Sequence, residues 1–331
     1  HVRLADEAIA LEGRGASAYL DIAQIVQLAK DAGCDGVHPG YGFLSENANF
    51  AAAVEAANMT FIGPSVAALD AFGDKGKARA LAQACNVPVV AGLSEAITLQ
   101  QAEAFFAVHA DSGILLKAIA GGGGRGMRIV RSVDELADAF ARCQSEALAA
   151  FANDGLYAEQ LVASPRHIEV QIIGDGSGAV SHIWERECSL QRRHQKLVEI
   201  APSPTLDPAM RTAMCDAAVR LGKEINYAGL GTIEFLLDTN ANEFFFIEAN
   251  ARLQVEHTVT EEVTGIDLVR AQIEVAGGAS LHDLGLQQAD VPDPRGYAIQ
   301  LRINMETMTA EGDVMPAGGR LSKFEVPTGP G

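Results

Sequence analysis

The chain has 331 residues, of which 48% are hydrophobic, so it can bury a large core and divide into two or three compact units. Its 43 acidic residues exceed its 25 basic residues, and the formal net charge of −18 makes nucleic acid a poor general partner. No apolar run is long enough to span a bilayer, and the five cysteines show no zinc-ligand spacing. We therefore expect a protein of a reducing compartment, the cytoplasm or in a eukaryote the mitochondrial matrix, with no membrane partner.

Helix and strand patterns alternate in the first part of the chain. Apolar residues recur at helical spacing over 21–31, and the Gly-Pro pair at 63–64 ends a short apolar strand. Helices are expected over 21–31, 47–57 and 75–85, and short strands near Gly36 and over 60–62. This alternation predicts a partial doubly wound α/β domain over 1–62, followed by a linker over 63–89.

The middle of the chain has the pattern of a small α+β unit, which we place at 90–161. Strands are expected over 114–118 and 127–130, with one helix over 99–109 and a long one that ends near Phe151. Long strand patterns dominate the last part, 162–331. They cover 168–173, 179–184, 232–237 and 244–249, with a helix over 208–225, and predict an antiparallel-rich sheet backed by helices.

Four glycines, 121–124, join two strand patterns in the middle unit and are followed by Arg125 and Gly126. Residues without side chains let backbone N–H groups approach phosphate oxygens, but a flexible hairpin loop explains the glycines equally well. Two lysines favour phosphate binding. Lys117 lies within an apolar strand pattern, and Lys75 lies in the segment GDKGKAR ahead of the unit.

Two carboxylates occur in neighbouring strand patterns of the last part. Glu234 lies in TIEFLL, and Glu248 and Asn250 lie on one face of FFFIEAN. Buried carboxylates that face each other repel unless a cation lies between them, so the pair predicts Mg²⁺ or Mn²⁺ bridging to the phosphates of a nucleotide. The alternative is that these glutamates lie on edge strands and are exposed to water.

A candidate oxyanion site follows directly in RLQVEH, residues 252–257. Arg252 can bind a planar oxyanion through two hydrogen bonds, and Glu256 can act as a base. The charged segment 185–196, ERECSLQRRHQK, is expected from its charge alone to be a solvated loop. Cys188 within it is expected to be a small core residue and not a nucleophile.

Taken together and in this order, the motifs closely resemble the biotin carboxylase domain of the ATP-grasp superfamily along essentially the whole chain. The resemblance rests on HPGYGFLSEN (38–47), GGGGRGM (121–127), SPRHIEVQ (164–171), ERECSLQRRHQK (185–196), TIEF (232–235), FFFIEANARLQVEH (244–257) and GYAIQLRIN (296–304). It implies an ATP-grasp fold of mixed α/β and α+β type, in which 90–161 is a lid over ATP and 162–331 is an incomplete C-terminal domain.

The resemblance also implies the residues of the site. Those for ATP are Lys75, Lys117, Gly123, Gly124, Glu159, Gln160, Leu161, His167, Gln191, His194, Leu236, Glu234 and Glu248. Those for Mg²⁺ or Mn²⁺ are Glu234, Glu248 and Asn250, and those for bicarbonate are Lys196, Arg252, Gln254, Val255 and Glu256. Glu256 is the implied general base, and Arg252 and Lys196 are the other implied catalytic residues.

The implied reaction begins with bicarbonate attacking the γ-phosphate of ATP to give carboxyphosphate, and it ends with the carboxylation of biotin on a carrier protein. The implied partners are a biotin carboxyl carrier domain and a carboxyltransferase, fused or separate. Whether the intact parent forms an oligomer stays open. Against the family pattern both ends look truncated: an earlier βαβ unit and a later arginine that faces biotin are expected in the parent.

Two alternatives stay open at this point. The first is another carboxyphosphate-forming ligase that resembles carbamoyl phosphate synthetase, although RRHQK and QVEH disfavour it. The second is a nucleotide-binding module that is inactive because it is truncated.

Overall fold

A computed structural model of the chain describes residues 3–93, 95–120, 126–163, 165–192, 195–312 and 314–326. It divides into two compact units, His1–Gln300 and Leu301–Gly331. The second unit contains an antiparallel pair, β13 (Glu306–Met308) with β14 (Val314–Pro316). The first unit holds the residues that were predicted for the site. Within the described ranges, no helix has the length and apolar character needed to cross a membrane.

The first part of the chain alternates helix and strand, as predicted. Its elements are the 3₁₀-helix η1 (Gly15–Leu20), α1 (Ile22–Asp31), β1 (Gly36–Val37), α2 (Ala48–Ala56), β2 (Thr60–Phe61), α3 (Val66–Gly73) and α4 (Lys75–Ala84). The strands β1 and β2 pair in parallel. The side chains of Asp21 and Asn47 accept hydrogen bonds from backbone N–H groups at the starts of α1 and α2, which satisfies donors that lack a partner inside the helix.

Helix α3 lies where only a linker was expected. Ser65 caps its first turn, and Leu69 and Phe72 are buried in the main core. Asp74 then caps α4 directly after α3 ends. The segment is therefore part of the packed structure, because its apolar side chains find partners on other elements.

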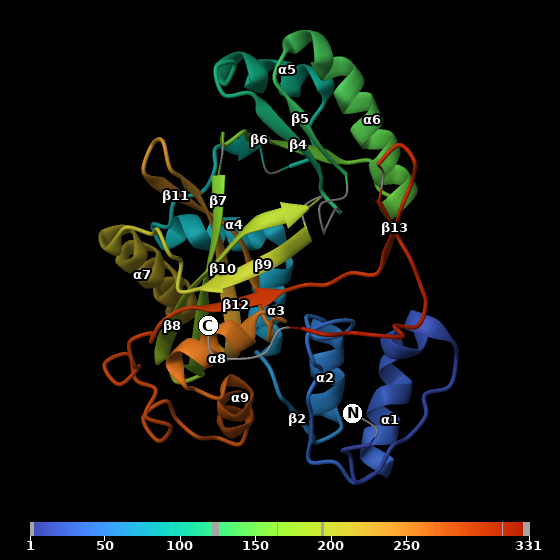
Figure 1. Cartoon of the computed structure of the whole chain (residues 1–331), viewed down its shortest axis with the longest axis vertical. Coiled ribbons are helices and arrows are strands. Elements are labelled where there is room, and N and C mark those ends of the chain that lie inside the picture. Colours follow the sequence, from blue (N-terminus) through green and yellow to red (C-terminus); the bar gives the residue numbers. More distant parts are fainter. Residues whose placement is uncertain are drawn as a thin grey trace. The chain divides into compact units, whose positions relative to one another are not determined.

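A four-stranded antiparallel sheet forms the middle of the chain, in the order β3-β6-β4-β5. Its elements are β3 (Gly92–Leu93), α5 (Leu99–Val108), β4 (Ile114–Ala118), β5 (Met127–Val130), α6 (Val133–Phe151) and β6 (Leu156–Gln160), drawn from teal to green in Figure 1. Helices α5 and α6 pack on each other, and Phe106, Leu116 and Phe140 share one core with the strands. The strands predicted at 114–118 and 127–130 are confirmed.

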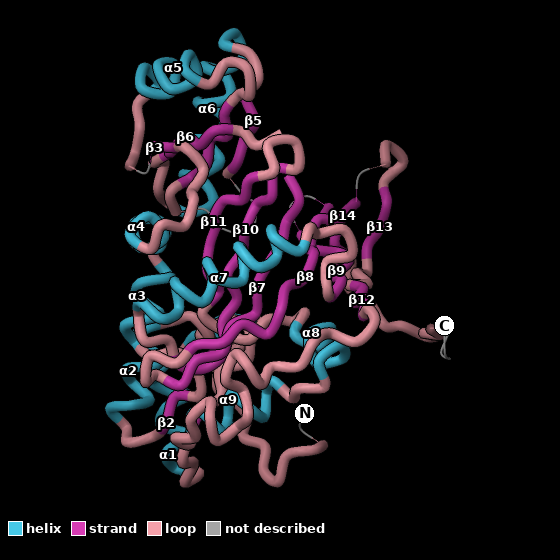
Figure 2. The backbone as a smooth tube through the Cα atoms, turned by 90° about the vertical axis from the view of Figure 1, so that its left-hand side faces the viewer, coloured by secondary structure: helices cyan, strands magenta, loops and turns pink. Residues whose placement is uncertain are grey.

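The largest sheet has six strands in the order β11-β10-β7-β8-β9-β12 (Figure 2). Its strands are β7 (Pro165–Asp175), β8 (Val180–Arg192), β9 (Gln195–Ala201), β10 (Ala228–Asp238), β11 (Glu243–Asn250) and β12 (Ala298–Leu301), and its helices are α7 (Pro208–Glu224), α8 (His257–Thr264) and α9 (Leu268–Ala276). The pairs β11–β10, β10–β7, β7–β8 and β8–β9 are antiparallel, which confirms the predicted antiparallel-rich sheet.

The two faces of this sheet differ in chemistry. In β7, Ile168 and Val170 point to one face and pack in the main core with residues of α3, α4 and α7. His167 and Glu169 alternate with them, so they point to the other face. The apolar face holds the sheet on its helices, and the polar face is left to carry the site.

The expectation that residues 185–196 form a solvated loop is wrong. Strand β8 continues through this segment to Arg192, and β9 begins at Gln195. Glu185, Arg186 and Cys188 are buried. The charges of Glu185 and Arg186 are neutralised by groups far away in the sequence, as in the 2.8 Å ion pair between Glu185 and Arg211 of α7. A charged segment can form a buried strand here because tertiary partners compensate the cost of burial.

Close packing at Gly174 of β7 leads to a first prediction. A Cβ atom there would lie 2.1 Å from the backbone oxygen of Tyr227, so the backbone must move to accept alanine. We expect Gly174→Ala to lower the free energy of unfolding by about 3 kcal/mol. Gly73→Ala at the end of α3 is the control, because nothing lies within 4 Å of a Cβ there. Urea unfolding of both variants checks this, and equal stabilities would contradict the predicted difference.

Candidate active site

A row of charged side chains crosses the polar face of the six-stranded sheet. Glu248 of β11, Glu234 of β10, Glu169 of β7 and Arg186 of β8 lie directly opposite one another in successive strand pairings. Glu169 and Arg186 are fully buried, and Glu234 is 4% exposed. Buried carboxylates on adjacent strands repel one another, so this charged row needs cations around it.

Lys196 of β9 supplies one of these cations. Its Nζ lies 2.5 Å from Glu169, 2.8 Å from Glu234 and 2.9 Å from Glu256. Burial alone would lower the pKa of Lys196, but the carboxylates outweigh burial and raise it well above its ordinary value. The three N–H donors of the ammonium can therefore each meet a carboxylate. Lys196 stays charged and joins the charged row to Glu256.

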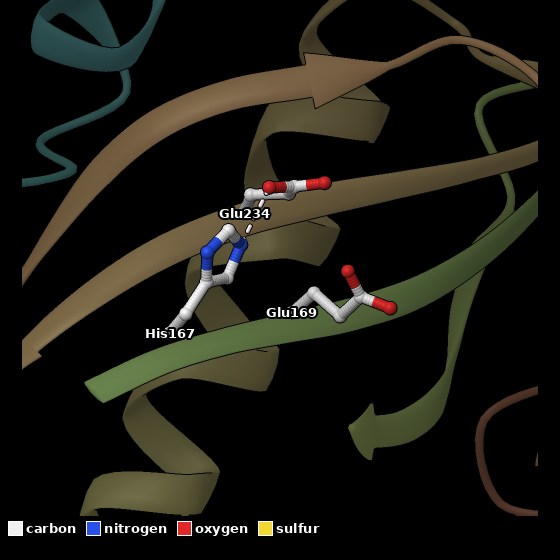
Figure 3. A group of neighbouring side chains, drawn as sticks. All are labelled: His167, Glu169 and Glu234. Atoms are coloured by element: carbon white, nitrogen blue, oxygen red, sulfur yellow. Dashed lines mark ion pairs between the residues drawn. The ribbon is translucent and has the colours of Figure 1, made fainter. Parts of the chain in front are cut away.

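His167 lies beside the charged row on β7 and points to Glu234 (Figure 3). Its Nε2 is 2.5 Å from a Glu234 oxygen, and Gln191 Nε2 is 2.9 Å from its Nδ1. Burial would lower the pKa of His167, but the neighbouring Glu234 raises it above its ordinary value. The structure thus brings two residues predicted for the nucleotide, His167 and Gln191, into one polar chain with Glu234.

The predicted metal ligands Glu234, Glu248 and Asn250 meet where β10 pairs with β11. Glu234 lies opposite Glu248, and Asn250 Nδ2 donates to Glu234 at 2.8 Å. Burial, followed by the charge of Glu234, raises the pKa of Glu248. Two opposed carboxylates and a side-chain amide are hard oxygen donors of the kind that Mg²⁺ and Mn²⁺ prefer. These residues therefore fit the predicted ion.

Two other groups of side chains have ligand atoms within 4.8 Å of one another, His167 with Glu169 and Glu234, and Glu169 with Cys188 and Glu256. The ammonium of Lys196 already contacts carboxylates of both groups and takes the place of a cation there. Burial raises the pKa of the Cys188 thiol well above its ordinary value, which opposes formation of the thiolate that a metal ligand or a nucleophile requires.

The state of Cys188 can be tested directly. We expect a thiol reagent at neutral pH to label the exposed Cys34 rapidly and to leave the buried Cys188 unlabelled until the chain unfolds. Peptide mass spectrometry after a short and a long exposure distinguishes the two cysteines. Rapid labelling of Cys188 in the folded chain would show that the sheet does not protect it.

Four of the five predicted bicarbonate residues, Arg252, Gln254, Val255 and Glu256, follow β11 in one loop. Arg252 Nε donates to Glu46 at 2.7 Å, and its Nη2 donates to Asn250 at 2.9 Å. Arg252 is partly exposed, and so is Val255 further along the loop. Glu46 and Asn250 thus hold the guanidinium of Arg252 beside the predicted metal ligands.

Gln254 and Glu256 are buried polar residues of this loop. Gln254 Nε2 donates to Glu234 at 3.0 Å, and Glu256 accepts from Lys196 at 2.9 Å. Glu256 also stands at the N-cap position of α8, where backbone N–H groups favour negative charge. The structure therefore assembles Lys196, Gln254 and Glu256 within one network.

The predicted residues of the middle sheet lie at the pairing of β4 with β6. Lys117 forms an ion pair with Glu159, and its Nζ lies 5.8 Å from the centre of the Tyr157 ring. Gln160 ends β6, and Leu161 follows it and is buried. Lys117 thus lies beside Glu159, Gln160 and Leu161, which were also predicted for ATP.

The remaining predicted nucleotide residues are divided between several elements. Lys75 is the first residue of α4, and its charge opposes the effects of burial and of Glu234 that raise the pKa of Glu248. Leu236 lies on β10 opposite His167. Gly123, Gly124 and His194 lie outside the described residues.

Five buried residues of this network were not predicted: Glu169, Gln171, Arg186, Thr232 and Thr260. The sequence carries a signal for the first two. In HIEVQ, polar residues alternate with apolar ones, which places His167, Glu169 and Gln171 on one face of a strand. Arg186 has no such signal, because both of its neighbours, Glu185 and Glu187, are also charged.

Comparison with known families identifies two matching regions. Residues 74–284 match the model of the carbamoyl-phosphate synthase L chain ATP-binding domain, and residues 1–69 match the model of the biotin carboxylase N-terminal domain. The biotin carboxylase of Campylobacter jejuni, solved as a complex with an ATP ligand, is 42% identical with a TM-score of 0.89. That match covers 99% of this chain and 72% of the other.

Other relatives are carboxylases of several organisms. The biotin carboxylase domain of Hydrogenobacter thermophilus 2-oxoglutarate carboxylase, solved with MgADP and bicarbonate, is 42% identical over 92% of this chain and 66% of its own, with a TM-score of 0.85. Pyruvate carboxylase of Bacillus subtilis is 49% identical over 98% of this chain, and the human mitochondrial enzyme 50% over 100%. The chain spans 28% of the length of each of these two enzymes. It belongs to the biotin carboxylase family, with the ATP-grasp fold.

Proposed function

We propose that this chain carries out the first half-reaction of a biotin-dependent carboxylase, the ATP- and bicarbonate-dependent carboxylation of biotin on a carrier protein. The observation that carries the proposal is the Lys196 ammonium held by Glu169, Glu234 and Glu256, next to the predicted anion and metal residues. Such a site can neutralise phosphate, bind an oxyanion and accept its proton within a few ångströms. The ATP and bicarbonate complexes of the relatives support it.

ATP would lie between the middle sheet and the polar face of the large sheet. The residues proposed to contact it are Lys75, Lys117, Gly123, Gly124, Glu159, Gln160, Leu161, His167, Gln191, His194, Leu236, Glu234 and Glu248. The segment 90–161 would serve as the lid, since closing it excludes water from a labile intermediate. Lysines contribute point charges to phosphate oxygens, and oriented groups lower the barrier to phosphoryl transfer mainly by positioning.

Glu234, Glu248 and Asn250 would hold Mg²⁺ or Mn²⁺. When bound, the ion would neutralise negative charge on the phosphates, and it would remove the repulsion between the two opposed glutamates. The chain's own contribution is to fix these oxygen donors on adjacent strands, with His167 and Lys196 holding the orientation of Glu234.

Bicarbonate would lie among Lys196, Arg252, Gln254, the Val255 backbone and Glu256. Glu256 would take the bicarbonate proton while a bicarbonate oxygen attacks the γ-phosphorus and ADP leaves. The product, carboxyphosphate, would break into CO₂ and phosphate, and the CO₂ would bond to the N1 nitrogen of biotin as the N1 proton passes to the released phosphate. Lys196 and Arg252 would stabilise the negative charge that builds up on the oxygens.

The proposed partners are a biotin carboxyl carrier domain and a carboxyltransferase, which belong to the parts of the relatives that this chain does not span. The compartment we propose is the cytoplasm or, in a eukaryote, the mitochondrial matrix. The human relative, named as mitochondrial, supports the second setting.

The test is ADP release by the full-length polypeptide that contains this chain, with Mg-ATP, with or without bicarbonate and with or without free biotin. Stimulation by biotin that requires bicarbonate supports the proposal. ADP release that requires bicarbonate but ignores biotin would favour a ligase resembling carbamoyl phosphate synthetase. ATP binding without either dependence would favour an inactive nucleotide-binding module.

A further inference from the structure

Arg186 lies at the end of the charged row, and its guanidinium is fully buried. Its Nε donates to Glu169 at 2.5 Å. Its remaining acceptors are Gln171 at 2.7 Å, Gln254 at 3.0 Å, and Thr232 and Thr260 at 3.1 Å each. A guanidinium has five N–H donors, so these five acceptors, on two strands, the loop before α8 and α8 itself, can match all of them. The orientation of Arg186 is thus fixed in every direction.

Two of the five acceptors lead into the proposed bicarbonate site. The other oxygen of Glu169 accepts from Lys196 at 2.5 Å, so Arg186 fixes the carboxylate that holds the site's ammonium. The Oε1 atom of Gln254 accepts from Arg186, while its Nε2 donates to Glu234 at 3.0 Å. Arg186 therefore orients both Gln254 and the carboxylate that holds Lys196, although it is not itself among the residues predicted to contact a substrate.

The bond to Gln254 decides which end of its amide faces the site. With Oε1 held by Arg186, the N–H end is turned toward Glu234 of the charged row, whose Oε1 also accepts from the Lys196 ammonium. An oxyanion needs a donor at this position, because the amide oxygen would repel it. If the guanidinium were lost, the amide could turn over, and a side chain that attracts bicarbonate would become one that opposes it.

We propose that Arg186 is a positioning residue for the oxyanion site, which sets the amide orientation of Gln254 and the place of Lys196. The proposal rests on the proposed function, since it assigns Gln254 and Lys196 to bicarbonate. It distinguishes Arg186 from a residue that serves stability alone: loss of orientation weakens bicarbonate binding selectively, whereas loss of stability does not change one substrate's KM.

The first variant is Arg186→Lys in the full-length polypeptide. Lysine keeps a positive charge near Glu169, but a single ammonium cannot reach the five acceptors that the planar fork reaches. We expect the KM for bicarbonate to rise about 10-fold or more, while the KM for ATP changes less than about twofold. Thermal unfolding, measured in parallel, shows whether the variant is folded at the assay temperature.

A milder pair of variants tests the positioning role of Arg186 if Arg186→Lys does not fold. Thr260 and Thr264 are both buried in α8, one turn apart, but only Thr260 accepts from Arg186, whereas the Thr264 hydroxyl donates to the Thr260 backbone oxygen. We expect Thr260→Val to raise the KM for bicarbonate about threefold and Thr264→Val to leave it unchanged. Both changes are nearly isosteric, so their effects on packing are matched.

The outcomes separate the inference from the function on which it rests. If the unchanged protein shows no bicarbonate-dependent ADP release, the proposed function fails, and the assignment of Arg186 fails with it. If the unchanged protein depends on bicarbonate but Thr260→Val matches Thr264→Val in its KM for bicarbonate, the positioning role is overturned and the proposed function stands. A rise in the bicarbonate KM for Thr260→Val alone supports the inference.

Discussion

Replacing Glu256 with glutamine is expected to lower bicarbonate-dependent ADP release by the full-length polypeptide about 100-fold or more. Glutamine has nearly the same size and keeps an oxygen that can accept from Lys196, so the change removes the base and little else. Nucleotide affinity should be nearly unchanged, because Glu256 lies in the loop before α8 and is not among the proposed ATP contacts. Steady-state ADP release and calorimetric ATP titration measure the two quantities.

The matched control is Glu262→Gln, the same chemical change at an exposed position of α8. It should leave both ADP release and ATP affinity as they are, since surface substitutions away from a site have small effects. Equal bicarbonate-dependent rates for Glu256→Gln and the unchanged protein would remove Glu256 from the mechanism as its base.

Lys196→Met is expected to cause a loss of turnover of similar size together with a loss of stability. Methionine fills the space of the side chain but leaves Glu169, Glu234 and Glu256 without their shared ammonium. Removal of one partner of a buried ion pair typically costs about 3–5 kcal/mol of unfolding free energy, because the remaining charge is left without compensation. Urea unfolding at neutral pH measures this cost.

A double variant tests the physical reason for the loss. Lys196→Met combined with Glu256→Gln removes one of the three carboxylates that lose the ammonium, so it should be more stable than Lys196→Met alone, by about 1 kcal/mol or more. Lys30→Met, at an exposed position of α1, is the control and should change stability by less than about 0.5 kcal/mol. Additive effects of the two site changes would argue against a direct contact between Lys196 and Glu256.

The two variants also separate binding from chemistry in the proposed site. Glu256→Gln keeps the cation and removes the base, whereas Lys196→Met removes the cation and keeps the base. If both variants still bind ATP but only Lys196→Met loses stability, the two residues have different roles in one network: Glu256 accepts the proton, and the charge of Lys196 stabilises the fold.

Local patterns in the sequence were sufficient for most of the secondary structure and for part of the site. Apolar runs mark β4 and β10 as strands, and the alternation of polar and apolar residues marks β7, because successive side chains of a strand point to opposite faces. The same alternation places Glu248 and Asn250 together on β11. Family resemblance, carried by whole motifs, pointed to Lys196 and Glu256 as parts of one site, which no local pattern could have done.

Only the tertiary structure decided how the charges are paired. The contacts of Lys196 join residues 27, 38 and 60 positions away in the sequence, and those of Arg186 join residues 15 to 74 positions away. Whether a charged segment is a solvated loop or a buried strand depends on such partners, since burial is tolerated only when charges of opposite sign meet. For that reason the segment 185–196 was misread from its composition, while its chemistry follows directly from the pairing of β8 with β7 and β9.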